Sequence, residues 1–378
     1  MSWSVADRQY MARAIQLARR GRYTTQPNPR VGCVLVKEGE IVGEGFHFRA
    51  GEGHAEVNAL TAAGDKARGA TAYVTLEPCS HYGRTPPCAE GLIKAGVARV
   101  VSAMVDPNPQ VAGRGIKMLQ QAGIEADSGL LENDARGLNP GFIKRMETGL
   151  PLVRVKIATS LDGRTAMASG ESKWITGSAA RSDVQKLRAQ SSAILTGVES
   201  ILHDDSALTV REEQLGLDNA KEIVKHQPLR VVLDSKLRMP LDASILKQSG
   251  RTLVVTCSSE VSAIAALEKA GAEVLQMDAD INGRVGLLSL LKWLGKEEQC
   301  NELLVETGAT LAGAFLQQRL VDEIRLYMAM KLMGSDARPA FALPLTKMSE
   351  QIELKQVDMR MLGSDLRMVL EPVYGDGQ

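Results

Sequence analysis

One stretch of the sequence, from His54 to Cys88, constrains the fold more than any other. It contains His54-Ala55-Glu56, then Pro78-Cys79, and then Cys88 after eight intervening residues. One imidazole and two thiolates are good zinc ligands, and a catalytic zinc keeps its fourth tetrahedral position for water. A chain that uses these three ligands together must fold so that His54, Cys79 and Cys88 meet at one point.

Glu56 lies two residues after His54 and is not needed as a ligand. Apolar residues at 57, 60 and 63 predict that His54 lies in the first turn of a helix. Two positions apart on a helix, the His54 and Glu56 side chains diverge by about 200°. Glu56 can therefore approach the bound water from the side and move protons to a substrate nitrogen, as the glutamate of zinc deaminases does.

The competing interpretation of this stretch is a structural zinc site or a chance spacing. Structural sites usually supply four protein ligands with closely paired cysteines, whereas three ligands and a non-ligand glutamate are present here. The long spacer between Cys79 and Cys88 departs from the two-residue spacing of the deaminase pattern, but both thiols can still bind one ion if the intervening loop folds outward. His47 and His81 are further possible ligands, but a fourth protein ligand would expel the water, so we interpret both as polar residues near the site mouth. Glu77 is expected to cap or orient the Pro-Cys turn.

Composition restricts the function classes. Lys+Arg and Asp+Glu both number 45, so the net charge of +0 argues against a nucleic-acid-binding protein that needs many phosphate contacts. The N-terminus has no apolar signal segment, and no apolar run approaches the length of about 18 residues that a membrane span needs. We expect no membrane association and a cytoplasmic protein. The length of 378 residues predicts two or three domains.

The order of predicted elements divides the chain into two α/β domains. Strands and helices alternate up to Gly149-Leu150-Pro151, with one helix expected over 132–148 and a mixed sheet covered by helices. The pattern then restarts, with a polar stretch at 214–227 that has the character of an insertion. We predict domains at residues 1–146 and 147–378.

Two further segments have alternative interpretations from their residues alone. Asn28, held between Pro27 and Pro29, is either a turn former or a pre-positioned hydrogen-bonding group. The predicted strand 302–306 runs into a glycine-containing turn at 308–313 and then a helix, which is either an anion site at a helix N-terminus or a packing turn.

The motifs together resemble a known family. The segments 27–32, 54–56 and 75–88 resemble the cytidine-deaminase-like family, and 75–88 is similar to its riboflavin-biosynthesis branch. Lys156-x-Ala158-x-Ser160-Leu161-Asp162-Gly163 and Trp174-Ile175-Thr176 resemble the reductase domain fused to that deaminase. The resemblance implies an α/β protein with an N-terminal cytidine-deaminase-like three-layer α/β/α domain and a C-terminal dihydrofolate-reductase-like α/β domain.

The resemblance also implies the chemistry. The first domain would hydrolyse the 2-amino group of a diaminopyrimidinone that carries a phosphoribosylamino group, and the second would reduce the ribosyl group to ribityl with NADPH. His54, Cys79 and Cys88 would bind Zn²⁺, and Glu56 would carry protons. The substrate would be a small phosphorylated pyrimidine rather than a nucleic acid, and we expect a homo-oligomer.

In the reductase domain the resemblance carries over further residues. Cofactor contacts are expected from Ala158, Trp174, Ser200, Asp204, Ser235, Gly308, Ala309, Thr310, Leu311, Ala312, Gly313 and Ala314. Substrate contacts are expected from Ser172, Arg188, Leu208, Arg211 and Glu306, with Arg188 and Arg211 suited to the phosphate as bidentate donors. Proton transfer to the ribose oxygen is assigned to Lys156, Asp204 or Glu306. In the first domain Asn28, His47 and Arg84 are expected to bind substrate.

Two rival hypotheses predict different measurements. A nucleic-acid base deaminase would act on a flipped base and would need a basic single-strand channel. In the second rival, the C-terminal half is a structural or ligand-sensing module that does not bind NADPH.

Overall fold

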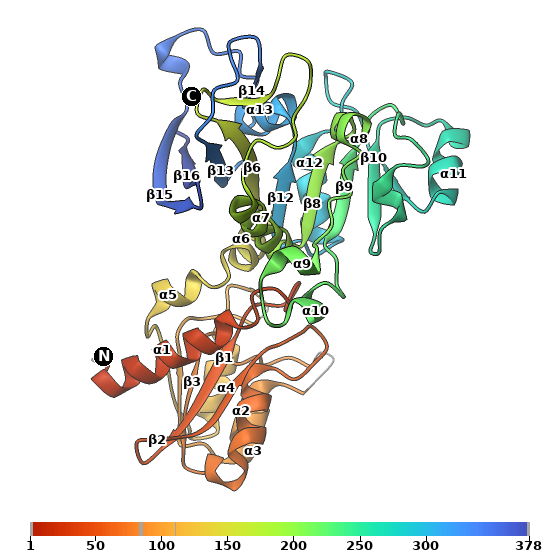
Figure 1. Cartoon of the computed structure of the whole chain (residues 1–378). Coiled ribbons are helices and arrows are strands. Elements are labelled where there is room, and N and C mark those ends of the chain that lie inside the picture. The colour runs from red at the N-terminus through yellow and green to blue at the C-terminus, as the bar shows by residue number, and fades with distance from the viewer. Residues whose placement is uncertain (1–2, 83–85, 110, 376–378) are drawn as a thin grey trace. The chain divides into compact units, whose positions relative to one another are not determined.

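The computed structural model describes residues 3–82, 86–109 and 111–375. The chain forms two compact units, residues 1–150 and 151–378 (Figure 1). The sequence-based boundary at 146/147 falls within helix α6 (Pro140–Thr148), and that finer placement stays a prediction. The described part of the chain offers no helix with the length and hydropathy that a membrane span requires.

The first unit is built on one mixed sheet in the order β2-β1-β3-β4-β5. β1 pairs antiparallel with both β2 and β3, whereas β3, β4 and β5 are parallel. The strands of this sheet are β1 (Gly32–Lys37), β2 (Glu40–Phe46), β3 (Thr71–Val74), β4 (Arg99–Ser102) and β5 (Glu125–Ser128).

Helices cover both faces of this sheet, and a separate apolar core lies on each face. One core packs α1, α5 and α6 against the sheet. The other packs α2, α3 and α4 against it, with much of its contact made by the small side chains of α2. The elements are α1 (Val5–Arg19), α2 (Ala55–Ala63), α3 (Cys88–Ala95), α4 (Arg114–Gln121), α5 (Glu132–Arg136), α6 and the 3-10 helix η1 (Gly64–Ala67).

The single helix expected over 132–148 is wrong, because the structure has two helices there. Pro140 begins α6, and the residue before a proline is disfavoured in the helical region. Asn139 accordingly has φ −130 and ψ 43, and its side chain bonds both backbone groups of Arg30, at 2.7 and 2.9 Å. The break therefore ties the end of the first unit to the segment that leads into β1.

The second unit is built on a nine-stranded sheet in the order β11-β10-β9-β8-β12-β6-β13-β16-β15. The strands from β11 to β13 along this order are parallel, and β16 and β15 add an antiparallel edge. The strands are β6 (Leu152–Ser160), β8 (Ala193–Gly197), β9 (Leu229–Leu233), β10 (Thr252–Thr256), β11 (Glu273–Gln276), β12 (Glu302–Glu306), β13 (Glu323–Ala329), β15 (Glu353–Leu362) and β16 (Asp365–Val373), with β7 (Arg164–Ala166) and β14 (Arg338–Pro339) forming a separate pair.

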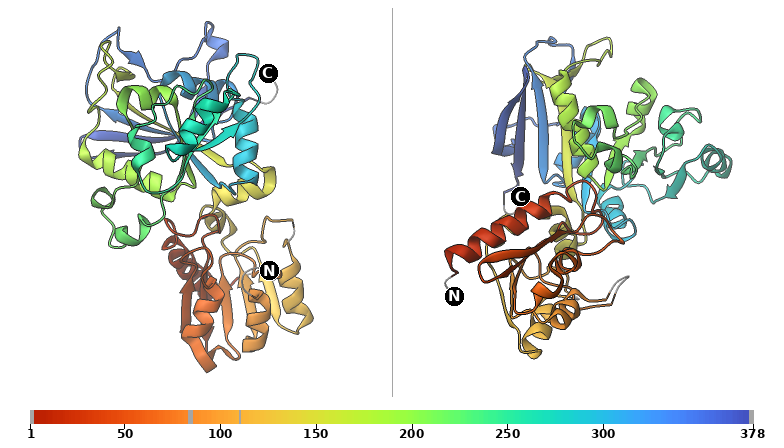
Figure 2. Two further views of the ribbon diagram at one scale, coloured as in Figure 1. Left: turned by 90° about the vertical axis from the view of Figure 1, so that its right-hand side faces the viewer. Right: turned by 60° about the horizontal axis from the view of Figure 1, so that its bottom comes forward.

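Helices flank this sheet on both faces (Figures 1 and 2). The polar stretch 214–227 contains α10 and the end of α9, which bury Leu215 and Ile223. The helices are α7 (Ser178–Gln190), α8 (Val198–Asp204), α9 (Glu212–Leu215), α10 (Ala220–Ile223), α11 (Val261–Lys269), α12 (Leu287–Lys296) and α13 (Ala309–Gln317), with 3-10 turns η2 (Ser244–Lys247) and η3 (Met348–Glu350).

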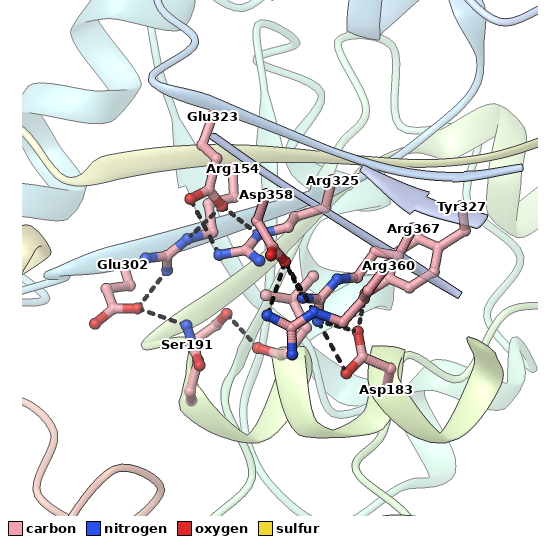
Figure 3. A network of polar contacts seen from close by, with 12 residues as sticks. Arg154, Asp183, Ser191, Glu302, Glu323, Arg325, Tyr327, Asp358, Arg360 and Arg367 are labelled. Carbon is pink, nitrogen blue, oxygen red and sulfur yellow. Dashed lines mark hydrogen bonds and ion pairs between the residues drawn. The ribbon is translucent and has the colours of Figure 1, made fainter. Parts of the chain in front are cut away.

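A buried ion-pair network ties the middle of this sheet together (Figure 3). Arg154 on β6 pairs with Glu302 on β12 and, at 2.9 Å, with Glu323 on β13. The Arg154 side chain is 6% exposed and that of Glu302 is 2% exposed. Buried charges are tolerated when they are paired, so each of these three side chains depends on the others.

Candidate active sites

The structure brings the three predicted zinc ligands to one point in the first unit. The donor atoms of His54, Cys79 and Cys88 lie within 4.8 Å of one another. His54 Nδ1 lies 3.2 Å from Cys88 Sγ and 3.8 Å from Cys79 Sγ. Tetrahedral zinc with bonds of about 2.0 Å to nitrogen and 2.3 Å to sulfur would separate such donors by about 3.5 Å. The donor set and its spacing therefore fit one zinc ion.

Local structure explains why these side chains converge. His54 is the N-cap of α2 rather than a residue of its first turn, and Cys88 is the first residue of α3. α2 approaches β2 closely because Gly45 has no side chain; a Cβ there would lie 2.3 Å from the Ala55 carbonyl oxygen. The Cys88 N–H at the start of α3 donates to Cys79 Sγ at 3.2 Å.

This environment favours a thiolate at Cys79. A hydrogen bond from the Cys88 thiol, together with one from His54 and one from the Cys88 N–H, lowers the pKa of Cys79 to about 4. The same thiol hydrogen bond, with burial, raises the pKa of the Cys88 thiol. One ligand is thus ionised before any metal binds, and zinc would displace the proton of the second.

Glu56 lies buried beside the ligands, in the first turn of α2. Burial, reinforced by Cys79, raises the pKa of Glu56 to about 7. A carboxyl group with a pKa near neutrality can both accept and donate a proton, which is the property that general acid–base catalysis requires.

Asn28 and His47 form a hydrogen-bonded chain next to His54. His47 is 2% exposed, so its predicted position at the site mouth is wrong. Burial lowers the pKa of His47, and its neutral ring donates from Nδ1 to the Gly53 carbonyl at 3.1 Å. Nε2 therefore accepts from Asn28 Nδ2, also at 3.1 Å. The amide orientation of Asn28 is fixed, which favours the pre-positioned interpretation of this residue. His81 is exposed, and Arg84 lies outside the described residues.

In the second unit, the predicted cofactor residues gather at the carboxyl edge of the parallel strands. Ser200 lies in α8 after β8, Ser235 follows β9, and 308–314 follows β12. Ligands of open α/β sheets bind at this edge. Gly308 is the N-cap of α13, an arrangement that suits an anion. Gly313 has a packing role, since a Cβ there would lie 2.1 Å from the Ala342 carbonyl oxygen.

Three predicted catalytic and substrate residues of this unit form one ion-paired cluster. Glu306 binds the Arg188 fork, with Oε1 2.6 Å from Nε and Oε2 3.0 Å from Nη2, and lies 3.5 Å from Lys156 Nζ. Burial acts to raise the pKa of Glu306, but Arg188 and Lys156 outweigh it and hold the pKa at about 2. Glu306 therefore stays ionised, and the Arg188 fork that was predicted to bind phosphate is directed at Glu306.

The remaining predicted residues lie around this edge. Asp204 accepts from the Ser172 hydroxyl at 3.0 Å. Trp174 is exposed and stacks with Arg181 at 4.7 Å. Leu208 is buried, and Arg211 is exposed. Ala158 lies on β6, two residues after Lys156.

Two residues that bond the backbone beside predicted site residues were not singled out from the sequence. Lys331 donates from Nζ to the carbonyls of Trp174 and Ile175 at 3.2 and 2.8 Å. Asn58 donates to the Gly53 carbonyl before His54 at 3.2 Å. Asn58 could have been found as a polar residue in the first turn of α2, where its side chain can reach the segment before the helix. Lys331 had no local signal, because its partners lie far away in the sequence.

The fold and the first site define a zinc-dependent deaminase joined to a second α/β domain. Two family models match the chain: the cytidine and deoxycytidylate deaminase zinc-binding region over residues 4–104, and the RibD C-terminal domain over 151–368. Riboflavin biosynthesis protein RibD of Escherichia coli is 53% identical over 95% of this chain and 98% of its own length. The Haemophilus influenzae protein of the same name is 50% identical, with coverages of 98% and 99%.

Solved structures agree with the sequence relatives. RibD of Acinetobacter baumannii has a TM-score of 0.90 at 49% identity and covers 98% of this chain and 99% of its own. A Thermotoga maritima structure, described as a diaminohydroxyphosphoribosylaminopyrimidine deaminase/5-amino-6-(5-phosphoribosylamino)uracil reductase, has a TM-score of 0.85 at 33% identity, with coverages of 97% and 99%.

The chain belongs to the riboflavin biosynthesis protein RibD family. It is a bifunctional deaminase and reductase of riboflavin biosynthesis, with zinc and NADPH as its cofactors. The predicted fold class of both domains is confirmed.

Proposed function

We propose that the first unit hydrolyses 2,5-diamino-6-(5-phosphoribosylamino)pyrimidin-4-one to the corresponding uracil, and that the second unit reduces its ribosyl group to ribityl. The observation that carries the proposal is the convergence of His54, Cys79 and Cys88 beside the buried Glu56. The substrates named for the Thermotoga protein support the choice of pyrimidine.

In the deaminase unit, His54, Cys79 and Cys88 would hold the zinc, which when bound lowers the pKa of water. The role of Glu56 would be to accept a proton from the attacking water and to donate one to the leaving amine, because its pKa near 7 permits both transfers. Asn28, oriented by His47, leaves its Oδ1 as an acceptor for a substrate N–H.

In the reductase unit, NADPH supplies the hydride that reaches the sugar carbon, and a proton must reach the ring oxygen that becomes a hydroxyl group. Since Glu306 stays ionised, it is a poor proton donor. We assign the donation to Lys156, whose ammonium group Glu306 holds in place. Asp204, bonded to Ser172, serves the cofactor side of the site.

The cofactor is assigned to Ala158, Trp174, Ser200, Asp204, Ser235 and the segment 308–314. The helix N-terminus at Gly308 supports a phosphate position there. The substrate is assigned to Ser172, Leu208, Arg211 and Glu306, with Arg188 holding Glu306 in place.

We further propose a cytoplasmic homo-oligomer. β15 is an edge strand, and unpaired edges are ready sites for another chain to pair. Large apolar side chains are exposed along it, which supports self-association through this edge. These side chains are Leu354, Val357, Met359 and Met361. Analytical ultracentrifugation tests the proposal, and a monomer at micromolar concentration would refute it.

One assay tests the two reactions together. Purified protein is given the phosphoribosylamino pyrimidine with and without NADPH, and ammonia and NADPH oxidation are followed. Ammonia release without NADPH, and NADPH oxidation that depends on the deaminated product, are expected. Ammonia release from a cytosine oligonucleotide, with none from the pyrimidine ribotide, would instead support the nucleic-acid rival. A full-length protein that does not bind NADPH would support the ligand-sensing rival.

A further inference from the structure

Glu77 is a buried carboxylate two residues before the zinc ligand Cys79, and its surroundings differ from those of a surface cap. It is 3% exposed, and each of its oxygens accepts two backbone N–H groups. The donors to Oε2 are Asp106 at 3.1 Å and Gly113 at 2.8 Å, and those to Oε1 are Gly115 at 2.8 Å and Ile116 at 3.3 Å. Four N–H groups, two of them in the first turn of α4, stabilise the negative charge.

The backbone on each side of Glu77 is held as well. The Glu77 N–H donates to the Met104 carbonyl at 3.0 Å, just after the end of β4. Gly115 lies directly against the Pro78–Cys79 peptide, because a Cβ there would lie 2.0 Å from the Pro78 carbonyl oxygen. The Pro78–Cys79 turn therefore rests on the start of α4, with Glu77 as the hydrogen-bonded link between them.

The same carboxylate also fixes the segment that follows β4. The Asp106 N–H donates to Glu77, and the Asp106 side chain in turn accepts from the Asn108 N–H at 2.8 Å. Glu77 thus joins two pieces of backbone that are far apart in sequence, the turn that carries Cys79 and the backbone at Asp106 and Gly113. Movement of either piece relative to the other would break bonds to one buried charge, which is costly.

We propose that Glu77 is a positioning residue for the zinc ligand Cys79. It holds the Pro78–Cys79 turn on the start of α4, so that Cys79 Sγ faces His54 Nδ1 at the spacing that zinc requires. The inference rests on the zinc role proposed for Cys79. Partners that orient metal ligands without touching the metal commonly change metal affinity by about 10–100-fold when they are replaced.

The test compares Glu77→Gln with a matched control in the full-length protein. Glutamine keeps the shape but has one acceptor oxygen, so about half of the four bonds are lost. Asp7→Asn is the control, since Asp7 is another buried carboxylate of the same unit, bonded to Ser4, Tyr73 and Arg99 away from the ligands. Zinc affinity is measured by competition with a chromophoric chelator, Co²⁺-substituted protein is measured by absorption, and thermal unfolding is followed in parallel.

For Glu77→Gln we expect zinc affinity to fall by about 10-fold or more, the Co²⁺ spectrum to shift, and deamination kcat to fall at saturating zinc. NADPH-dependent reduction in the same chain should be unchanged. Asp7→Asn should lower thermal stability and leave zinc affinity unchanged. Unchanged zinc affinity and Co²⁺ spectrum in Glu77→Gln, with only a stability loss like that of Asp7→Asn, would overturn the proposal.

A third variant separates this inference from the proposed zinc site. Cys79→Ser should weaken zinc binding more than Glu77→Gln does, because it removes a ligand. Unchanged zinc binding in Cys79→Ser would show that the proposed ligand set itself is wrong. A loss in Cys79→Ser with none in Glu77→Gln would refute the positioning role alone.

Discussion

Replacing Arg188 by methionine should lower the unfolding free energy of the reductase unit. The size of the loss follows from the pKa of Glu306. The pKa of Glu306 lies at about 2, against an ordinary value of 4.5, because Arg188 and Lys156 outweigh the effect of burial. At about 1.4 kcal/mol per pKa unit, this difference corresponds to about 3 kcal/mol of stability at neutral pH. Arg188→Met removes the fork that supplies most of this stabilisation and leaves a buried charge with Lys156 as its remaining cation.

The pH dependence of the effect has a definite sign. A carboxyl whose pKa is depressed by folding contributes its full stability above its unfolded pKa, and that stability is lost as the pH falls through 4.5 toward 2. At pH 3 the same relation leaves about 1 kcal/mol of the stability that ionised Glu306 contributes in the wild type. In Arg188→Met the pKa of Glu306 rises, so the stability of the variant falls less than that of the wild type as the pH is lowered. The difference in unfolding free energy between wild type and variant should therefore narrow from about 3 to about 1 kcal/mol between pH 7 and pH 3.

Urea unfolding followed by tryptophan fluorescence measures this difference. The chain has three tryptophans, and a Trp3→Phe background leaves Trp174 and Trp293, both in the second unit. Lys186→Met makes the same change of charge on the same helix and is the control, with an expected effect below about 0.5 kcal/mol. Arg188→Met could instead lower the unfolding free energy equally at pH 7 and pH 3, or by no more than Lys186→Met does. Either result would refute the view that Arg188 offsets the cost of burying the Glu306 charge.

Three further variants test the two sites and the sheet. Glu56→Gln should keep its zinc, by metal analysis, and lose deamination while it still reduces supplied deaminated substrate; retained ammonia release would contradict the proton-carrier role. Lys156→Gln should stop NADPH oxidation and spare ammonia release, and an unchanged reduction rate would assign the proton donor elsewhere. Arg154→Leu leaves Glu302 buried without its guanidinium partner (Figure 3), so urea unfolding should show a loss of about 3–5 kcal/mol, whereas the exposed pair partner Arg251→Leu should cost less than about 1 kcal/mol.

The deaminase site was predictable because its signals are local. The ligands occur where a helix begins or a strand ends, and Glu56 stands at a fixed offset from His54. Two details were not predicted, the burial of His47 and the break between α5 and α6. The burial of His47 follows from the packing of β2 against the loop before α2, and Asn139 breaks the helix at Pro140 where it also bonds Arg30. A proline alone could have indicated the second, because the residue before it avoids the helical region.

The reductase site was less predictable, because its geometry comes from the order of strands in the sheet. Lys156 and Glu306 stand side by side because β6 and β12 are neighbouring parallel strands with these two residues in register. The sequence pattern predicts each strand but does not indicate which strands are neighbours. The pairing of Arg188 with Glu306, 118 residues apart, was therefore beyond reach, although both residues were singled out.

That pairing bears directly on how the substrate phosphate is recognised. Arg188 donates from Nε and Nη2 to Glu306 and from Nη1 to the Thr209 carbonyl, so its bidentate face is directed inward. A phosphate that took this face would leave Glu306 buried beside a second anion, at a cost comparable to the roughly 3 kcal/mol estimated for losing the fork. Arg211 is exposed and lies two residues after Thr209, on the same segment that Arg188 holds through that carbonyl. We therefore infer different roles for the two arginines. Arg188 holds Glu306 and the segment at Thr209 in place, and Arg211 binds the phosphate.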